Sequence, residues 1–430
     1  MSPVNSPYPP QTLAETIYLQ DMPVAVAAPP DRLVVRENLG LITAPALDGQ
    51  VVYRTQRGTV FETRAIKTPG GDYLLMFPAS TPSLPEGHSH YGRADRKVND
   101  LVAFRSTDRG ASWSGPTRPM DVDYNLHGFV PLTPSAGGGV PEGRIYCFGT
   151  QPIWGLYTRE RGLHENAPIG FRYSDDDGNT WSEVRLIRPL NDPDFTGMSA
   201  MRMCETEAGT WLLGSHESDW SYRPLMTRQY ILRSEDQGRS WELLPHARHG
   251  GWHAGGFNRM DELRPIDLGG GEVYALARTP EGHLWNLRSL DDGRTWSEPK
   301  PTPLVHPDAP PMLFKLSNGN LVAFHHNRHH DLDYTGLHGD KEASMADRSE
   351  IWVAISADGG RTWSEPRFVF ANALAPEYDQ PFMNHQCSYI DAFVDDGVAN
   401  LFVPHRWHQA LHLRIEEAAL RELPTFAELY

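Results

Sequence analysis

Cysteine is scarce in this sequence, with only Cys147, Cys204 and Cys387 among 430 residues. Three cysteines are too few for a disulfide framework, and their apolar neighbours predict buried, reduced thiols. No run of 18 or more apolar residues occurs, so we expect no transmembrane helix and no membrane partner. The N-terminus lacks the basic and apolar regions of a secretory signal, which favours a cytoplasmic protein, or a secreted or periplasmic one whose signal has been removed.

Positive charge is also in deficit, because 39 Lys and Arg face 55 Asp and Glu, for a net charge of −16. A chain this acidic has no overall field that attracts nucleic acid, so we expect no nucleic-acid partner. The 39% of hydrophobic residues, with 12 Trp, 16 Tyr and 16 Phe, exclude a disordered chain and a coiled coil. An anionic ligand would therefore need a local cluster of arginines.

One motif, Ser-x-Asp-x-Gly-x-(Ser/Thr)-Trp, occurs five times, and each copy follows a short apolar or aromatic run that is typical of a strand. Its glycine can take the positive φ of a hairpin turn, and its Ser and Asp can bond nearby backbone N–H groups. Its Trp can pack under the hairpin. We interpret the motifs as structural. The copies are Ser106–Trp113, Ser174–Trp181, Ser234–Trp241, Ser289–Trp296 and Ser356–Trp363.

Six pairs of strands with glycine-containing turns alternate with these motifs, and each of the first five pairs is followed by a motif. Four-stranded units that recur every 55–68 residues predict an all-β fold, a six-bladed β-propeller of four-stranded antiparallel blades. We expect one domain over residues 1–430. The N-terminal segment, about 1–50, should wrap round and complete the last blade with the stretch 33–42. A pair of β-sandwiches is the alternative fold.

The repeated motif resembles the Asp box, or BNR repeat, of the sialidase (neuraminidase) superfamily, and the resemblance runs from about residue 62 to 405. It implies a sialidase-like propeller whose site lies where the blades meet. Sialidases hold the substrate carboxylate with three arginines, attack with a Tyr–Glu pair and use an Asp as acid/base. By resemblance of the surrounding segments, the nucleophile is Tyr389, its partner is Glu262, and two of the arginines are Arg278 and Arg348.

Two positions depart from the family pattern. Where the family has the arginine of an Arg-Ile-Pro motif, this chain has Glu62, and Arg64 shares a strand face with it two residues later. The acid/base Asp has no clear counterpart, so we assign that role to Asp100 or to His88 in the preceding loop. The expected rim of the site is also rich in histidine. Further candidates are His127 as a catalytic residue and Arg202, His216 and His326 as substrate-binding residues.

Three functions agree with these patterns, and the first two share an acidic sugar held by arginines, so the expected partner is an acidic oligosaccharide or glycoconjugate. The preferred hypothesis is an exo-glycosidase of sialidase type. The alternative is a polysaccharide lyase that cleaves a uronic-acid glycan by β-elimination with His, Tyr and Arg. The third is a glycan-binding propeller without catalysis. No cofactor is expected, although the histidines of the stretch 325–330 leave a divalent metal open, and the oligomeric state is open as well.

Overall fold

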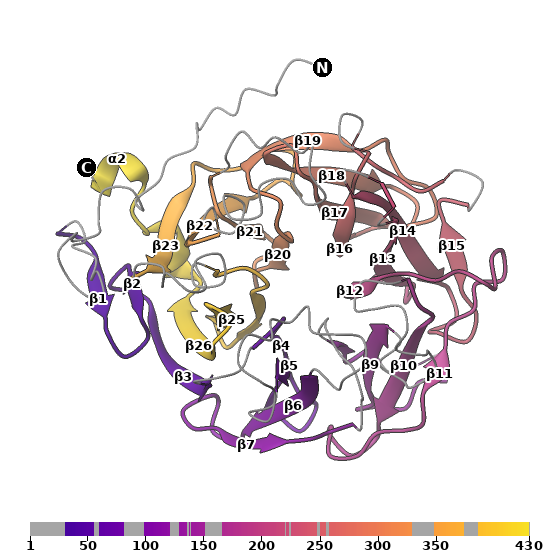
Figure 1. Cartoon of the computed structure of the whole chain (residues 1–430), viewed down its shortest axis with the longest axis horizontal. Coiled ribbons are helices and arrows are strands. Elements are labelled where there is room, and N and C mark those ends of the chain that lie inside the picture. The colour runs from indigo at the N-terminus through magenta and orange to yellow at the C-terminus, as the bar shows by residue number, and fades with distance from the viewer. Residues whose placement is uncertain are drawn as a thin grey trace.

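Six antiparallel sheets stand round a common axis in the computed structural model (Figure 1), which confirms the predicted six-bladed propeller. The first strand of each blade lies nearest the axis, and the second, third and fourth follow outwards. The structure describes residues 31–55, 60–80, 99–120, 129–135, 137, 139–150, 166–219, 221–222, 225–246, 250–254, 258–328, 348–373 and 386–429.

The first three blades take their strands in chain order. Blade 1 contains β4 (Arg64–Lys67), β5 (Tyr73–Ser80), β6 (Asn99–Ser106) and β7 (Ser114–Thr117). Blade 2 contains β8 (Val130–Leu132), β9 (Ile145–Thr150), β10 (Ile169–Ser174) and β11 (Arg185–Leu186). Blade 3 contains β12 (Ser199–Glu205), β13 (Trp211–Asp219), β14 (Met226–Ser234) and β15 (Glu242–Leu244).

The last three blades continue the pattern. Blade 4 contains β16 (Asp261–Gly269), β17 (Glu272–Arg278), β18 (His283–Ser289) and β19 (Lys300–Val305). Blade 5 contains β20 (Met312–Lys315), β21 (Leu321–His325), β22 (Glu350–Ser356) and β23 (Arg367–Asn372). Blade 6 contains β24 (Asp391–Asp395), β25 (Val398–His405) and β26 (Gln409–Glu416), followed by the short helices η2 (Ala418–Arg421) and α2 (Phe426–Leu429).

The stretch that completes the last blade differs from the expected one. Blade 6 takes its outer strand from β3 (Asp48–Arg54), which pairs with β26. The expected stretch instead forms a hairpin of β1 (Val34–Arg36) and β2 (Leu41–Thr43), which extends blade 5 at β23. The physical reason is burial, because the hairpin places the fully buried Leu41 and Ile42 against blade 5.

The core lies between neighbouring blades, where aromatic and branched side chains of facing sheets interlock. Tyr146 of blade 2, for example, meets Trp211 of blade 3 edge-on, with ring centroids 4.9 Å apart. All three cysteines are buried, as predicted, and none forms a disulfide. Neither of the helices in the described part of the chain has the length and hydropathy needed to span a bilayer.

Each repeated motif forms the turn between the third and fourth strands of a blade, as the sequence predicts. In the third copy, Asp236 accepts hydrogen bonds from the Ser240 backbone N–H (2.8 Å) and hydroxyl (2.6 Å). Gly238 has a φ of 85°, and its N–H donates to the Ser234 hydroxyl at 2.8 Å. Trp241 is buried beneath the turn. The Ser and Asp side chains of the motif therefore bond within the turn itself.

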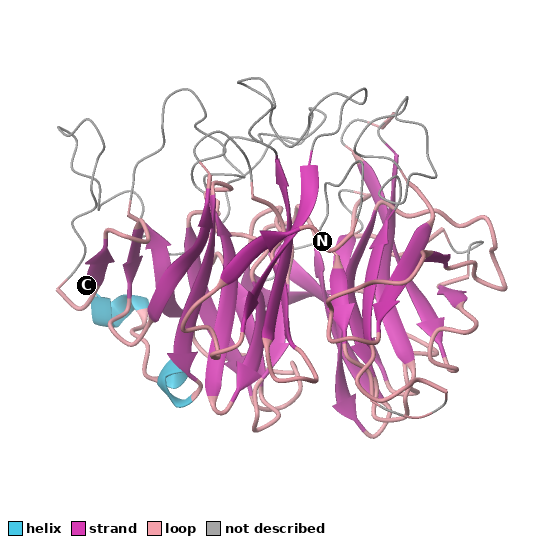
Figure 2. Ribbon diagram, turned by 90° about the horizontal axis from the view of Figure 1, so that it is seen from below, coloured by secondary structure: helices cyan, strands magenta, loops and turns pink. Residues whose placement is uncertain are grey.

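The strands run between two ends of the ring (Figure 2). The inner strands start at one end, here called the upper end, and finish at the other, here called the lower end. Because successive strands alternate in direction, all five motif turns lie at the lower end. Residues that precede the inner strands therefore meet at the upper end, around the axis.

Candidate active site

Tyr389 and Glu262 meet across the axis at the upper end. Tyr389 comes just before β24 of blade 6, Glu262 lies at the start of β16 of blade 4, and the tyrosine hydroxyl donates to Glu262 Oε1 at 3.1 Å. Both residues have a positive φ, 64° and 54°. Residues other than glycine pay free energy for this conformation, and such strain concentrates at functional sites. The pair predicted by resemblance is therefore in contact, in a strained backbone.

Arg278 holds the other side of the Glu262 carboxylate. It is the last residue of β17, and its Nη1 donates to Glu262 Oε2 at 3.0 Å. Its Nε donates to Asp308 Oδ1 at 2.7 Å, so Nη2 is the nitrogen that remains for a ligand. The side chain is 13% exposed, which leaves it accessible from the upper end.

The protonation states of this pair suit a base and an activated hydroxyl. Burial raises the pKa of Tyr389 well above its usual value, and the negative charge of Glu262 adds to that rise. Burial would also raise the pKa of Glu262, but Arg278 outweighs it and the pKa of Glu262 falls below its usual value. Near neutral pH the proton therefore sits on the Tyr389 oxygen and points at an ionised carboxylate.

Asp308 joins Arg278 to two more arginines. Its Oδ2 accepts from Arg259 Nη1 at 2.9 Å, and its backbone carbonyl accepts from Arg348 Nη2. Arg348 also donates to Gln386 Oε1 at 3.2 Å. Burial would raise the pKa of Asp308, but Arg259 and Arg278 lower it, so the group is ionised. Arg278 and Arg348 thus meet at Asp308, Arg278 through its carboxylate and Arg348 through its backbone carbonyl, and their contact with a substrate carboxylate stays a prediction.

Glu62 brings a second glutamate to the pair. Its charge raises the pKa of both Tyr389 and Glu262, which places it near them at the upper end. Glu62 Oε2 accepts from Arg64 Nη2 at 3.2 Å, while Arg64 Nη1 donates to the Thr63 carbonyl. Arg64 is only 1% exposed. The expectation that Arg64 reaches a substrate thus needs correction, because its guanidinium is turned into the protein and holds Glu62.

Comparison with family models matches residues 149–400 to the BNR repeat-like domain. This match covers more than half of the chain and four of its five repeated motifs. The chain belongs to the BNR repeat-like family. Its sheets and motif turns give it the architecture of a sialidase-like BNR propeller.

Solved structures share the fold of this BNR propeller at low sequence identity. A protein of unknown function from Dyadobacter fermentans aligns with a TM-score of 0.61 and 15% identity, over 86% of this chain and 99% of that one. The NanB sialidase of Streptococcus pneumoniae gives 0.57 and 12%, over 87% and 71%. The Trypanosoma rangeli sialidase gives 0.53 and 11%, over 88% and 60%. At such low sequence identities, the structural similarity shows a common fold. Comparison with curated proteins gave no match.

Arg202 lies elsewhere in the BNR propeller. It extends from β12 into the central tunnel and donates to Asp391 Oδ1. It also lines a cavity of about 490 Å³ together with Lys315, the last residue of β20, and Val394, near the end of β24. Because inner strands finish at the lower end, this cavity is at the far side of the ring from Tyr389. The expected role of Arg202 in substrate binding beside Tyr389 is therefore not what the structure shows.

His326 has both ring nitrogens occupied inside the protein. Nδ1 lies 2.7 Å from the Glu350 carbonyl and Nε2 lies 2.7 Å from the Ser388 hydroxyl. Burial lowers the pKa of His326 to about 3, so the ring is neutral. The expectation that His326 binds substrate is corrected accordingly, since this histidine supports the segment before β24.

Of the remaining candidate residues, one lies close to the Tyr389–Glu262 pair and the others do not lie there or are outside the described residues. His216 is buried, with Nδ1 3.0 Å from the Ser199 hydroxyl, and its charge lowers the pKa of Glu262, which places it close to the pair. Asp100 lies on β6, two strands out from the axis, and forms a 2.6 Å ion pair with Arg118. Asp100 is thus paired with Arg118 on the third strand of its blade and not on an inner strand beside Tyr389, contrary to the expectation. His88 and His127 lie outside the described residues.

Metal-binding residues receive no support from the described part of the chain, where no three His, Cys, Asp or Glu side chains are grouped as ligands of one ion. His325 Nδ1 lies 2.9 Å from the Val305 carbonyl, whereas His326 turns to a different strand, as expected for neighbours in an extended segment. His329 and His330 lie outside the described residues.

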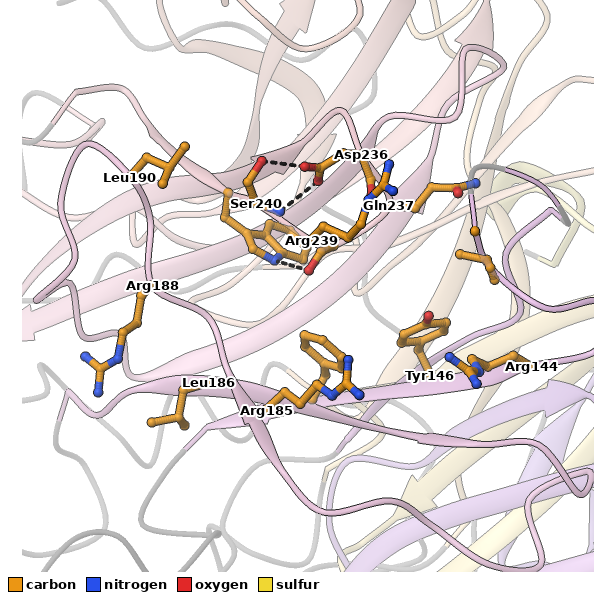
Figure 3. A pocket seen from close by; sticks show the side chains of 15 residues that line it. Arg144, Tyr146, Arg185, Leu186, Arg188, Leu190, Asp236, Gln237, Arg239 and Ser240 are labelled. Atoms are coloured by element: carbon orange, nitrogen blue, oxygen red, sulfur yellow. Dashed lines mark hydrogen bonds between the residues drawn. The ribbon is translucent and has the colours of Figure 1, made fainter.

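A second cavity of about 560 Å³ lies between blades 2 and 3 at the lower end, beside the motif turn of Asp236 (Figure 3). Figure 3 shows Asp236 bonded to Ser240 within that turn, with Arg188 apart from it on the opposite wall. None of the residues predicted for the site lines this cavity. It therefore belongs to the junction of two blades and not to the Tyr389 site.

Proposed function

We propose that this protein is a glycoside hydrolase of the sialidase type, which attacks the anomeric carbon of an acidic sugar with Tyr389. The observation that carries the proposal is the 3.1 Å hydrogen bond from the Tyr389 hydroxyl to Glu262 Oε1. A phenol is a poor nucleophile near neutral pH, and an adjacent ionised carboxylate is the means by which proteins activate one. The sialidase-like fold of the solved neighbours agrees with this chemistry.

The proposed reaction has two steps. In the first, the Tyr389 oxygen bonds to the anomeric carbon, its proton passes to Glu262, and the bond to the leaving oxygen breaks. In the second, water attacks the anomeric carbon, gives a proton to an acceptor on the leaving-group side, and the phenolate leaves and regains its proton from Glu262. We assign the acid that protonates the leaving oxygen to the loop that includes His88, outside the described residues.

The substrate carboxylate is assigned to Arg278, with Arg348 behind it, since Arg348 is only 3% exposed and its Nη1 and Nη2 are held by Gln386 and the Asp308 carbonyl. Nη2 is the Arg278 nitrogen assigned to the ligand, since Nη1 and Nε are held by Glu262 and Asp308. Three arginines contact Asp308, and their positive charges are offset by the carboxylates of Asp308, Glu262 and Asp261. The Asp261 carboxylate lies 2.9 Å from Arg259. Recognition of the sugar acid would then rest on directed hydrogen bonds more than on net positive field.

Product analysis tests the proposal against its rivals. Incubation with sialyl-oligosaccharides should release free sialic acid, and incubation with uronic-acid glycans should leave no unsaturated uronate. If the ultraviolet absorbance of an unsaturated uronate appears, the protein is a lyase that acts by elimination, and the hydrolase proposal is wrong. Binding of the glycans without any product, by a sample that is folded and monodisperse, would favour the glycan-binding alternative.

A further inference from the structure

Three arginines from three blades converge on the axis below the Tyr389 pair. Arg64 comes from blade 1, Arg202 from blade 3 and Arg264 from blade 4. Arg202 and Arg264 both lie over the ring of Phe314, with guanidinium carbons 5.4 and 5.9 Å from its centroid. Burial, and then the charges of Arg64 and Arg202, lower the pKa of Arg264 to about 9. The three guanidinium groups are therefore close neighbours.

The nearby carboxylates serve only two of the three. Asp391 accepts from Arg202 with one oxygen and from the Ala65 N–H with the other, at 2.9 Å. Glu62 accepts from Arg64 at 3.2 Å. Glu262, the next carboxylate, is taken up by Tyr389 and Arg278. The cluster is thus short of one negative charge, and the shortage falls on Arg264.

Arg264 is also short of acceptors. Its Nη1 reaches only the Ile390 carbonyl, at 3.3 Å, while Nε and Nη2 are buried with no hydrogen-bond partner among the described residues. Arg64 Nε is in the same position, and both side chains are 1% exposed. Burial of a charge and its donors without partners is costly, so these nitrogens call for an acceptor that the described residues do not supply.

We propose that a small monovalent anion of the halide type binds on the axis between Arg64 and Arg264. One charge fills the deficit, and a spherical anion can accept from donors that arrive from opposite blades. The lower cavity of about 490 Å³ reaches Arg202, one of the three arginines, whereas neither Arg64 nor Arg264 lines it. Arg264 also holds the carbonyl of Ile390, the neighbour of Tyr389, so the anion would fix the segment that carries the proposed nucleophile.

Unfolding of the wild-type protein at constant ionic strength tests the site. Chloride and bromide should raise the melting temperature saturably over sodium gluconate, by roughly 3–5 °C at a hundred times the dissociation constant. Crystals grown in bromide should show an anomalous peak between Arg64 and Arg264. Equal melting temperatures in all three salts, or a water molecule in place of the peak, would overturn the proposal.

A variant pair separates this site from general salt effects. Arg264→Met keeps an unbranched apolar stem and removes the unpaired charge, so the halide-specific rise should disappear. Arg188→Met, which alters an exposed arginine at a blade junction, should keep it. Retention of the full halide response in Arg264→Met would contradict the assignment, and the bromide experiment on the wild type stands even if that variant does not fold. Neither readout depends on glycosidase activity.

Discussion

Tyr389 and Glu262 are 127 residues apart in the chain, and only the ring of blades brings their side chains to 3.1 Å. Their segments could be selected from the sequence because each resembles a known segment, but the contact could not be derived from spacing. The role of Asp308 was not predictable at all, since its partners Arg259 and Arg278 come from other strands. At the scale of residues, the sequence shows which side chains are candidates for the site, and contacts between distant parts of the chain determine the role of each side chain.

Loss of the Tyr389 hydroxyl should abolish turnover and leave binding intact. Tyr389→Phe keeps the ring but removes the nucleophile, so we expect kcat to fall by at least about a thousandfold, the loss seen when such groups are deleted. Tyr173→Phe, on an outer strand of blade 2, is the matched control and should behave as the wild type. Steady-state kinetics with direct measurement of sugar binding check both, and full turnover by Tyr389→Phe would remove it from the mechanism.

Removal of the Asp308 charge should expose the arginines to an external carboxylate. Asp308→Asn keeps the size of the side chain but removes the counter-charge that Arg259 and Arg278 share, so that only Asp261 and Glu262 still pair with them, which we expect to cost about 3 kcal/mol of stability. N-acetylneuraminic acid should then raise the melting temperature of the variant more than that of the wild type. Equal shifts in the two proteins would mean that the sugar acid does not contact this cluster.

The pH profile should report the lowered pKa of Glu262. The carboxylate must be ionised to take the phenol proton, and burial, which would raise its pKa, is outweighed by Arg278. The acid limb of kcat/KM should therefore lie below the pKa of about 4.3 of an ordinary glutamate. Measurement of kcat/KM down to pH 3, with stability followed in parallel, checks this. An acid limb near pH 6 would show that another group titrates.

At the scale of elements, the five motif turns could be predicted almost completely from sequence, because the Ser and Asp side chains that shape each turn bond to residues of the same motif. The closing strand could not be, since two short N-terminal stretches, Val34–Arg36 with Leu41–Thr43 and Asp48–Arg54, are equally strand-like. Which outer edge each one joins depends on packing against Leu413 and other distant residues. Local sequence patterns thus predict turns better than they predict which strands pair with each other.

The motif aspartates should make stability sensitive to acid. Hydrogen bonds from Ser112 lower the pKa of Asp108 to about 2, and those from Thr180 lower the pKa of Asp176 to about 2. A folded-state pKa below the unfolded value of about 3.9 adds stability that is present above pH 4 and is lost as pH falls from 4 towards 2. Denaturant midpoints at pH 5, 4 and 3 should therefore fall, less steeply in Asp176→Asn, and a flat profile would refute this.

A motif aspartate should matter for stability and not for catalysis. Asp236→Ala removes three hydrogen bonds of its turn, two from Ser240 and one from Ser234, and should cost roughly 1–2 kcal/mol. Urea unfolding measures that loss, while kcat on the folded protein should be unchanged. A selective loss of activity at normal stability would contradict the structural role of the repeats.

At the scale of the whole molecule, the ring is closed by chain segments that are far apart in sequence. The Arg54 guanidinium bonds to the Gln409 side chain, 355 residues away, where β3 pairs with β26. Gly49 lies so close to this partner that a Cβ there would approach Leu413 Cδ2 to 2.5 Å. The sheet that holds Tyr389 in place is therefore made from both the early and the late parts of the chain.

Because β3 pairs with β26, the ring can close only late in the synthesis of the chain. On the ribosome, β3 emerges long before β26 exists, and the nascent chain must carry an unmatched strand edge through the translation of five other blades. Such an edge invites pairing with other chains, so interrupted translation products should be aggregation-prone and in need of chaperones. Tyr389 acquires its setting only when β24, β25 and β26 have been synthesised and β26 has paired with β3.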